Sequence, residues 1–203
     1  MQSRDGNQSI RLFENDFLER LTHVHPIVPL LFWGPVAVWL GWRSLYLHQL
    51  PPASVLGIGV LAILTWTLTE YCLHRFVFHY RAKSAIGKRL VYLFHGNHHD
   101  DPRDKTRLVM PPAGAIPIMA ALFLLFGLVI PTPWIEPFGA FFIAGYLTYD
   151  YIHYATHHFR MQNPIAKALK RHHLKHHYSG EAGRYGVSSP LWDLVFRTTG
   201  ESR

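Results

Sequence analysis

The sequence contains a single cysteine, Cys72, among 203 residues. One thiol excludes an intramolecular disulfide and a metal cage built from cysteines. Charged residues are also scarce: they make up 16% of the chain, whereas average proteins carry about a quarter. Any metal site must therefore take its ligands from other residue types, and the positions of the few charges become informative.

Long stretches of the chain carry no charge at all. Uncharged spans of 22, 26 and 28 residues lie between Arg20 and Arg43, between Arg43 and Glu70, and between Arg107 and Glu136. Each is long enough to cross the hydrocarbon core of a bilayer. A fourth span, 137–149, has 13 residues; it crosses only if residues 133–136 contribute at the interface, and it could instead be tilted, short or re-entrant. Four such runs leave too little polar chain to cover them as buried core helices, so we predict a multi-pass membrane protein.

The charges also predict the topology. The apolar runs pair into two hairpins, at about 27–73 and 113–152, and Lys and Arg gather after each hairpin. The hairpin turns carry only Arg43 and Glu136 as fixed charges, so the positive-inside rule places the segments after both hairpins in the cytoplasm. We therefore predict an all-α integral membrane protein whose four apolar helices carry a cytoplasmic helical cap.

The N-terminal segment, 1–26, is polar by comparison. No basic start leads directly into an apolar stretch, so we do not expect a cleavable signal peptide. Four apolar residues recur at helical spacing and predict an amphipathic helix at the membrane interface: Ile10, Phe13, Phe17 and Leu21. The chain then divides into this interfacial segment and one membrane domain, 27–203.

Histidine is abundant where cysteine is not. Twelve of the 15 histidines lie in two stretches, 74–99 and 153–177, which we call the first and second cassettes. A shift of 78 positions places four of the five histidines of the first cassette on histidines of the second, and the fifth misses by one residue. The pairs are His79 with His157, His95 with His173, His98 with His176, His99 with His177 and, one residue out of step, His74 with His153. Scattered surface histidines would not repeat their spacing, so we predict that the two cassettes perform one task together.

The spacing within the cassettes indicates metal binding. In a helix, His95, His98 and His99 share one face, and so do their equivalents in the second cassette. His74 and His79 are five residues apart and would diverge on an ideal helix, so we expect a π-bulge between them. Ten imidazoles exceed the needs of one ion and suit two metals with open positions. His158 and His172 match Tyr80 and Phe94 under the shift, which makes them the spare histidines.

The formal net charge of +7 does not by itself indicate nucleic acid. A basic face against anionic lipid headgroups explains the same residues, and the sequence has no groove-reading motif. We predict the membrane and a lipid as partners, and no nucleic acid.

Beyond the histidines, the chain resembles the membrane di-metal oxygenases of the fatty acid hydroxylase and sterol desaturase superfamily, and most closely the fatty acid 2-hydroxylases. The resemblance covers about two thirds of the chain, from residue 69 onward. The segments that carry it are EYCLHRFVFH (70–79), HGNHH (95–99), RLVMPP (107–112), GYLTYDYIHYATHH (145–158), HLKHHY (173–178) and GVSSPLWD (186–193).

The resemblance implies an activity and a set of metal ligands. It implies O2-dependent insertion of oxygen at C2 of a long-chain fatty acyl group, in a sphingolipid or ceramide. The family's metal histidines fall on the ten that the internal repeat selects: His74, His79, His95, His98, His99, His153, His157, His173, His176 and His177. Sterol desaturation, carotenoid hydroxylation and a histidine-rich membrane metal carrier are the alternatives.

The chemistry implies iron and an outside source of electrons. Zinc has no redox chemistry, so we predict two iron ions with O2 as co-substrate, and zinc only as a substitute in purified protein. Family members often carry a fused cytochrome b5 domain, for which the residues before Thr69 leave no room. The expected donor is therefore a separate cytochrome b5-like or ferredoxin-type protein, and the expected location is a bacterial inner membrane rather than the endoplasmic reticulum.

Four further residues are candidates for the site. Glu70, one turn before His74, and Asp150, three residues before His153, could each accept the second N–H of that histidine. The alternative for Asp150 is a helix-end charge at the interface. Tyr146 and Tyr149 lie on the same predicted helix as Asp150, and the resemblance places all three near the substrate. An aromatic belt is the alternative for the two tyrosines.

Overall fold

The computed structural model describes residues 9–179 and 182–200, and in this part of the chain it contains helices and no strands. The helices are α1 (Asp16–Thr22), α2 (Val28–Trp42), α3 (Pro52–Cys72), α4 (Ala85–Val91), α5 (Asn97–Asp100), α6 (Pro112–Gly127), α7 (Ile135–His158), α8 (Pro164–Tyr178) and α9 (Leu191–Val195). Three π-helical segments continue them: η1 (Arg43–Leu47), η2 (Leu73–Phe78) and η3 (Tyr92–Gly96). The prediction of an all-α protein is confirmed.

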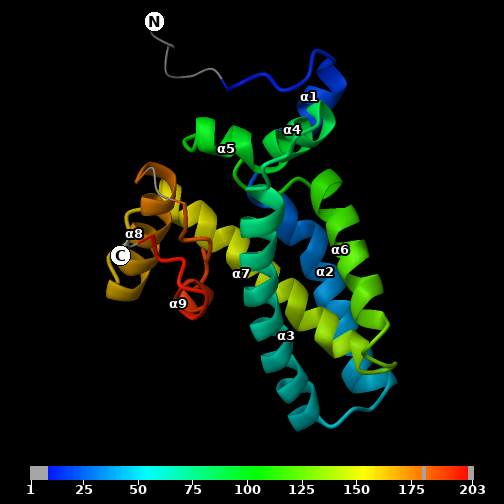
Figure 1. Cartoon of the computed structure of the whole chain (residues 1–203). Coiled ribbons are helices and arrows are strands. Elements are labelled where there is room, and N and C mark those ends of the chain that lie inside the picture. Colours follow the sequence, from blue (N-terminus) through cyan, green and yellow to red (C-terminus); the bar gives the residue numbers. More distant parts are fainter. Residues whose placement is uncertain (1–8, 180–181, 201–203) are drawn as a thin grey trace, which may run out of the picture.

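Four helices, α2, α3, α6 and α7, run alongside one another as a bundle, with α7 packed against both α2 and α3 (Figure 1). Aromatic side chains fill the interior: Phe142 is fully buried, and the Trp66 ring meets the rings of Phe142 and Tyr146 edge-on. A Cβ atom at Gly145 would lie 2.8 Å from Trp66, so the close contact of α3 with α7 requires glycine there.

Apolar side chains also cover the outside of the bundle. Val38, Leu124 and Leu128 expose 72%, 75% and 83% of their surface. Among the residues that the structure describes, one helix, Pro52–Phe78, could cross a membrane by length and composition, while Pro112–Gly127 is apolar but shorter. Proline begins both α3 and α6, where its missing N–H costs no hydrogen bond. The four predicted crossings stay a prediction.

The two hairpin turns are joined by an ion pair. Arg43 donates from Nε and Nη2 to the two carboxylate oxygens of Glu136, each at 2.8 Å. His48 Nε2 lies 3.1 Å from Glu136 Oε1. The only fixed charges expected in the hairpin turns therefore meet each other, at the end of the bundle away from the histidine cassettes.

The described part of the N-terminal segment, 9–26, lies across the opposite end of the bundle (Figure 1). Its helix is shorter than the spacing predicts, because Asn15 caps the first turn by accepting the N–H of Phe17 at 2.9 Å. Residues 9–15 form no regular secondary structure, and Glu19 accepts the N–H groups of Leu12 and Phe13. Arg107 pairs with Glu19, and this pair fixes the segment to the loop before α6.

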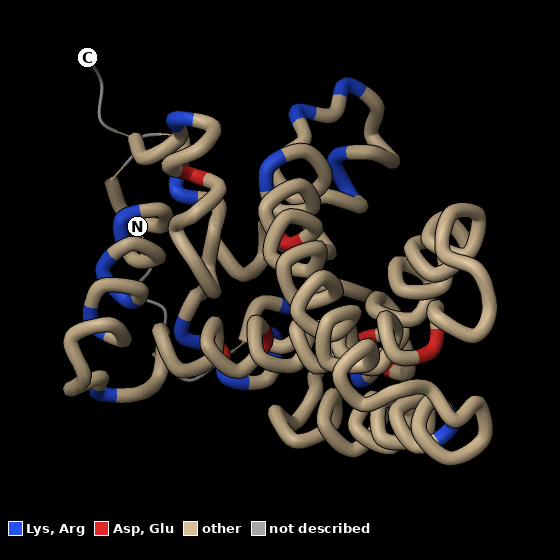
Figure 2. The backbone as a smooth tube through the Cα atoms, turned by 90° about the horizontal axis from the view of Figure 1, so that it is seen from below, with Lys and Arg blue, Asp and Glu red and all other residues tan. Residues whose placement is uncertain are grey.

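The C-terminal part, α8 and α9, packs beside the cassette end of the bundle. Viewed from below, α8 forms the left edge of the molecule and carries Lys and Arg along its outer side (Figure 2). Asn163 caps its first turn by accepting the N–H of Ile165 at 2.8 Å.

Candidate metal centre

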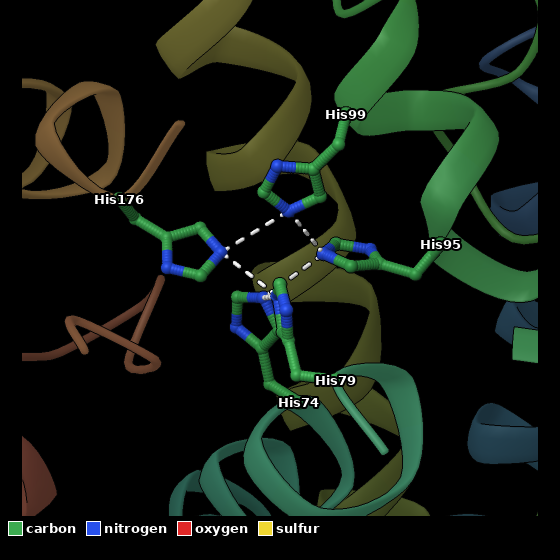
Figure 3. Close-up of side chains that lie close together, drawn as sticks. All are labelled: His74, His79, His95, His99 and His176. Carbon is green, nitrogen blue, oxygen red and sulfur yellow. Dashed lines mark hydrogen bonds between the residues drawn. The ribbon is translucent and has the colours of Figure 1, made fainter. Parts of the chain in front are cut away.

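Ten histidines gather into two compact groups, each of which offers one nitrogen per residue within 4.8 Å of the others. The first group consists of His74, His79, His95, His99 and His176, and Figure 3 shows their rings converging from separate helices. The second group consists of His98, His153, His157, His173 and His177. These are the ten histidines that the internal repeat selects.

The nitrogens of the first group form a closed ring. Neighbouring Nε2 atoms are 2.9–3.2 Å apart around the cycle His74, His95, His99, His176 and His79. Adjacent corners of an octahedron are √2 times the metal–ligand distance apart, so these separations fit a centre about 2.1–2.3 Å from each nitrogen. Metal–imidazole bonds are about 2.0–2.1 Å, so the donors suit a transition metal.

The second group has the same dimensions in a more open arrangement. Its Nε2 atoms are 2.8–3.1 Å apart along the series His153, His98, His177, His173 and His157. The rings of His98 and His157 also approach, with centroids 4.7 Å apart. Five imidazoles and no carboxylate is a donor set that suits iron, copper, nickel or zinc rather than calcium or magnesium.

The cassettes exchange one ligand. Four histidines of each cassette stay in their own group, but His98 of the first cassette joins the second group and His176 of the second cassette joins the first. His98 and His99 are consecutive on α5, so their side chains leave the helix about 100° apart. His176 and His177 are consecutive on α8 and do the same. Neither cassette completes a group alone, a feature that the spacing did not reveal.

A π-helical turn places His74 and His79 in one group, as predicted. Residues Leu73–Phe78 form η2, and the backbone N–H of His79 reaches the carbonyl of His74 at 3.1 Å. A second π-helical segment, η3, carries His95, and the Asn97 side chain donates to two of its carbonyls, those of Tyr92 and Leu93. The second cassette needs no such turn, because His153 and His157 are one α-helical turn apart on α7.

The imidazoles are held in the form that binds metal. Burial, followed by the proximity of other imidazoles, lowers the pKa of His99 to about 3 and that of His79 to about 4. Burial and the neighbouring His158 lower the pKa of His157 to about 4. At neutral pH these rings are therefore uncharged and keep a lone pair for a metal.

Backbone carbonyls orient two histidines of the first group. His74 donates from Nδ1 to the carbonyl of Tyr185 at 2.5 Å, and His176 donates from Nδ1 to that of Gly183 at 2.7 Å. These bonds fix the tautomer that leaves Nε2 free. In the second group, by contrast, the buried Nδ1 atoms of His153, His173 and His177 have no partner among the described residues.

Glu70 does not have the predicted contact with His74. Its carboxylate accepts the backbone N–H groups of Val187 and Ser188 at 2.6 and 2.8 Å, and also the Ser188 hydroxyl. The loop that brings these donors comes from the far end of the chain, which local spacing could not indicate. Glu70 therefore contacts the same loop whose Tyr185 carbonyl accepts the Nδ1–H of His74.

Asp193 completes this loop and was missed from the sequence. It is fully buried and accepts from the N–H groups of Tyr185 and Gly186 at 2.9 and 2.8 Å, from the Thr198 hydroxyl and from His172 Nε2 at 3.0 Å. A Cβ atom at Gly186 would lie 2.1 Å from the carbonyl oxygen of Ser189. The GVSSPLWD segment thus forms a tight turn around one carboxylate.

Asp150 also lacks its predicted contact. Its Oδ1 accepts the N–H of Met110 at 3.4 Å, and His153 Nδ1 has no partner in the described part of the chain. Asp150 and His153 are three residues apart and therefore share one face of α7, but the Asp150 carboxylate turns toward the loop before α6. The spare histidines lie outside both groups: His172 pairs with Asp193, and the His158 ring packs 4.6 Å from that of Tyr154.

A cavity of about 290 Å³ opens beside the metal groups. Histidines of both groups reach its wall: His95 from the first, His98 and His153 from the second. Tyr149 and Asp150 face it, and apolar residues of the N-terminal segment, of α4 and η3, and of the loop before α6 form most of the remaining wall. A smaller cavity of about 30 Å³ follows, lined by Trp66, Glu70 and Tyr146, and Tyr149 borders both. The arrangement offers an apolar chain a path to two metal groups.

Comparison with known proteins matches this site to lipid-modifying enzymes. The family model described as fatty acid hydroxylase matches residues 59–198. The dihydroceramide fatty acyl 2-hydroxylase FAH1 of Arabidopsis thaliana is 42% identical over 191 residues, covering 93% of this chain and 79% of that protein. The human fatty acid 2-hydroxylase is 31% identical over 213 residues, covering 93% of this chain and 56% of that protein. The solved structure of full-length scs7p, in which only the hydroxylase domain is visible, superimposes with a TM-score of 0.83 at 35% identity, covering 90% of this chain and 69% of that one.

Proposed function

The chain belongs to the fatty acid hydroxylase family and is an oxidoreductase, and from this premise we propose that it inserts oxygen at C2 of a long-chain fatty acyl group carried by a ceramide or another sphingolipid. The relatives named above are described as dihydroceramide or fatty acid 2-hydroxylases. The observation that carries the proposal is the pair of five-imidazole groups beside one apolar cavity.

The metals we propose are two iron ions, one held by each group of five histidines. Iron would supply the redox chemistry with O2 that a C–H bond requires, which zinc cannot provide. The chain contributes neutral imidazoles, an outer carbonyl for His74 and His176, and an apolar wall that limits the entry of water.

Three residues on α7 are proposed to contact the substrate. Tyr149 and Asp150 face the cavity, and Tyr146 lies beneath it at the smaller one. The Asp150 carboxylate could accept a hydrogen bond from an amide or hydroxyl of a lipid headgroup, which would hold C2 beside His153 and His98. The acyl tail would then follow the apolar wall.

We propose that the bundle spans a membrane as two hairpins, at about 27–73 and 113–152, in a domain that covers 27–203 and follows an interfacial segment, 1–26. The exposed apolar surface of α2, α3 and α6 and the Lys and Arg of the cassette end support a cytoplasmic position for the metal groups. The relatives named above come from a plant and an animal, so they give no support to the expected bacterial inner membrane.

The reaction also needs O2 and two electrons, for which we propose a separate cytochrome b5-like or ferredoxin-type donor. Expression in a host that lacks 2-hydroxy lipids, followed by mass spectrometry under ¹⁸O2, tests the function. We expect one ¹⁸O atom in a 2-hydroxyacyl lipid. A new double bond, a hydroxylated sterol or carotenoid, or no oxygenated lipid despite a competent reductant would contradict the proposal.

A further inference from the structure

The helix α8 presents two opposite faces. One carries His173, His176 and His177 into the metal groups, and His173 is fully buried. The other is exposed and basic, and we call it the basic face of α8. It surrounds a shallow hollow of about 600 Å³ that is lined by Lys167, Lys170, Arg171, Leu174, Lys175 and Tyr178, together with Ser179.

The composition of the basic face is that of a docking surface for a protein. Leu174 and the exposed Tyr178 lie on it among the basic residues, and Lys167, Arg171 and Lys175 repeat at four-residue intervals on the same face. No Asp or Glu among the described residues lines the hollow. Exposed aromatic side chains and Arg are enriched at protein interfaces.

The proposed reaction makes electron delivery a requirement. One oxygen atom of O2 enters the C–H bond and the other leaves as water, which consumes two electrons and two protons. Among the described residues, the two histidine groups are the sites that could hold redox-active metals. A carrier must therefore dock where its own redox centre comes close to both of them.

Only two helices in the described part of the chain give ligands to both groups. The first, α5, contributes His98 and His99 but ends in Asp100 and Asp101. The second, α8, contributes His176 to the first group and His173 and His177 to the second. A helix is about 10–12 Å thick with its side chains, so a protein seated on the outside of α8 lies about one helix width from both groups.

We propose that the basic face of α8 is the docking surface for an acidic one-electron carrier protein that reduces the metal groups. The inference rests on the proposed function, since it requires redox-active metals. Positive charge on this face attracts an acidic partner and repels a basic one, and the acidic end of α5 does the reverse. Figure 2 shows the blue segments of α8 at the edge of the molecule, where a partner has access.

The test reverses the charge of this face and measures electron transfer without any lipid substrate. Lys167→Glu, Arg171→Glu and Lys175→Glu are combined, and Lys170 is left intact because it donates to the carbonyl of Phe159. Two acidic carriers serve as probes: a reduced plant-type ferredoxin and a reduced soluble cytochrome b5 domain. Anaerobic stopped-flow gives the rate at which each reduces the iron-loaded protein, and titration gives the affinity of each oxidised carrier.

We expect the triple variant to lose about tenfold or more of the second-order rate at low salt and to lose the salt dependence of the wild type. Reduction by dithionite and metal content should not change. A matched variant that reverses Arg81, Lys83 and Lys88, which are exposed near α4, should keep the wild-type rate with at least one carrier.

Three outcomes would overturn the proposal. The triple variant could accept electrons and bind both carriers as the wild type does, or the matched variant could lose as much. Alternatively, the triple variant could lose binding to phosphatidylserine vesicles while electron transfer is unchanged, which would assign the face to lipid. Since none of these measurements uses a lipid substrate, a failure of the proposed hydroxylation would be seen separately.

Discussion

The two metal groups contain the same number of histidines and receive different support. The first is built partly on π-helical backbone, and two of its histidines donate from Nδ1 to backbone carbonyls. The second is built on α5, α7 and α8, and three of its Nδ1 atoms have no partner among the described residues. The internal repeat therefore reproduces the histidines of the two groups but not the hydrogen bonds that orient them. We therefore expect the two metals to differ in how firmly they are held.

Variants that test the exchange of ligands should have the largest effect on metal content. His98→Ala with His153→Ala removes two ligands of the second group and should leave one tight metal site per chain. His98→Ala with His95→Ala removes one ligand from each group and should leave no intact site. Both variants should lose activity, so metal analysis with a competing chelator is the measurement.

The control for the double variants is His158→Ala, which lies outside both groups and should retain both metals. His95 and His98 belong to the same cassette. If the variant that lacks both kept one intact metal site, the exchange of ligands would be wrong.

Loss of Asp193 should weaken the first group and leave the second nearly unchanged. Asp193→Ala frees the turn at Tyr185 and Gly186, so the first group should lose about 10–100-fold in metal affinity while the second changes little. Chelator titration should then show the metal of the first group released about 10–100-fold more readily than in the wild type, while the release of the other metal is unchanged. His172→Ala removes only the imidazole partner of Asp193 and serves as the control. Equal weakening of both sites would mean that the turn does not act on the first group alone.

Glu70→Gln should give a smaller effect in the same direction. The amide keeps one acceptor oxygen for the N–H groups of Val187 and Ser188 but loses the second carboxylate oxygen that accepts the Ser188 hydroxyl. The matched variant Ser188→Ala removes that hydroxyl bond from the other side, and the two should weaken the first group to a similar degree. If Glu70→Gln released metal from the second group first, Glu70 would act by another route.

Acid should release the metals of both groups over the same pH range, whereas a chelator should remove the two metals with different affinities. The pKa values of His79, His99 and His157 lie at about 4, 3 and 4, below the value of about 6.5 for free histidine. A lowered pKa means that protons compete with the metal only at lower pH. Metal content after dialysis should therefore hold from pH 7 to about pH 5 and fall near pH 4. Loss of one metal near pH 6.5 would show that one group is not buried as described.

The ion pair at the other end of the bundle should matter least for the metals. Arg43→Met removes both hydrogen bonds to Glu136. We expect a lower unfolding temperature in detergent and unchanged metal content. A hydrogen bond from Arg43, partly offset by burial, lowers the pKa of Glu136, so its contribution to stability is present above the unfolded value of about 4.5 and is lost as the pH falls below it. The difference between wild type and variant should therefore shrink in acid.

Sequence patterns indicated the ligands better than the residues around them. The 78-residue repeat selected ten histidines that the structure brings together, and the five-residue step from His74 to His79 predicted the π-helical turn. Spacing predicts which histidines share a face of a helix. It does not predict which of the two nearby histidine groups each side chain joins, so the exchange of His98 and His176 was not predicted. The contacts of Glu70 involve residues more than 100 positions away, and no local pattern encodes them.

The exchange of ligands also bears on how the enzyme acquires its metals during synthesis. His176 lies about 100 residues after His74 in the chain, and a protein emerges from the ribosome N-terminal end first. The early half of the chain can therefore offer only four of the five nitrogens of the first group and one of the second. A complete centre must wait until α8 has been made and has folded against α5. A metal ion can then be fully enclosed only after α8 has folded, which limits the time that a half-built site is exposed.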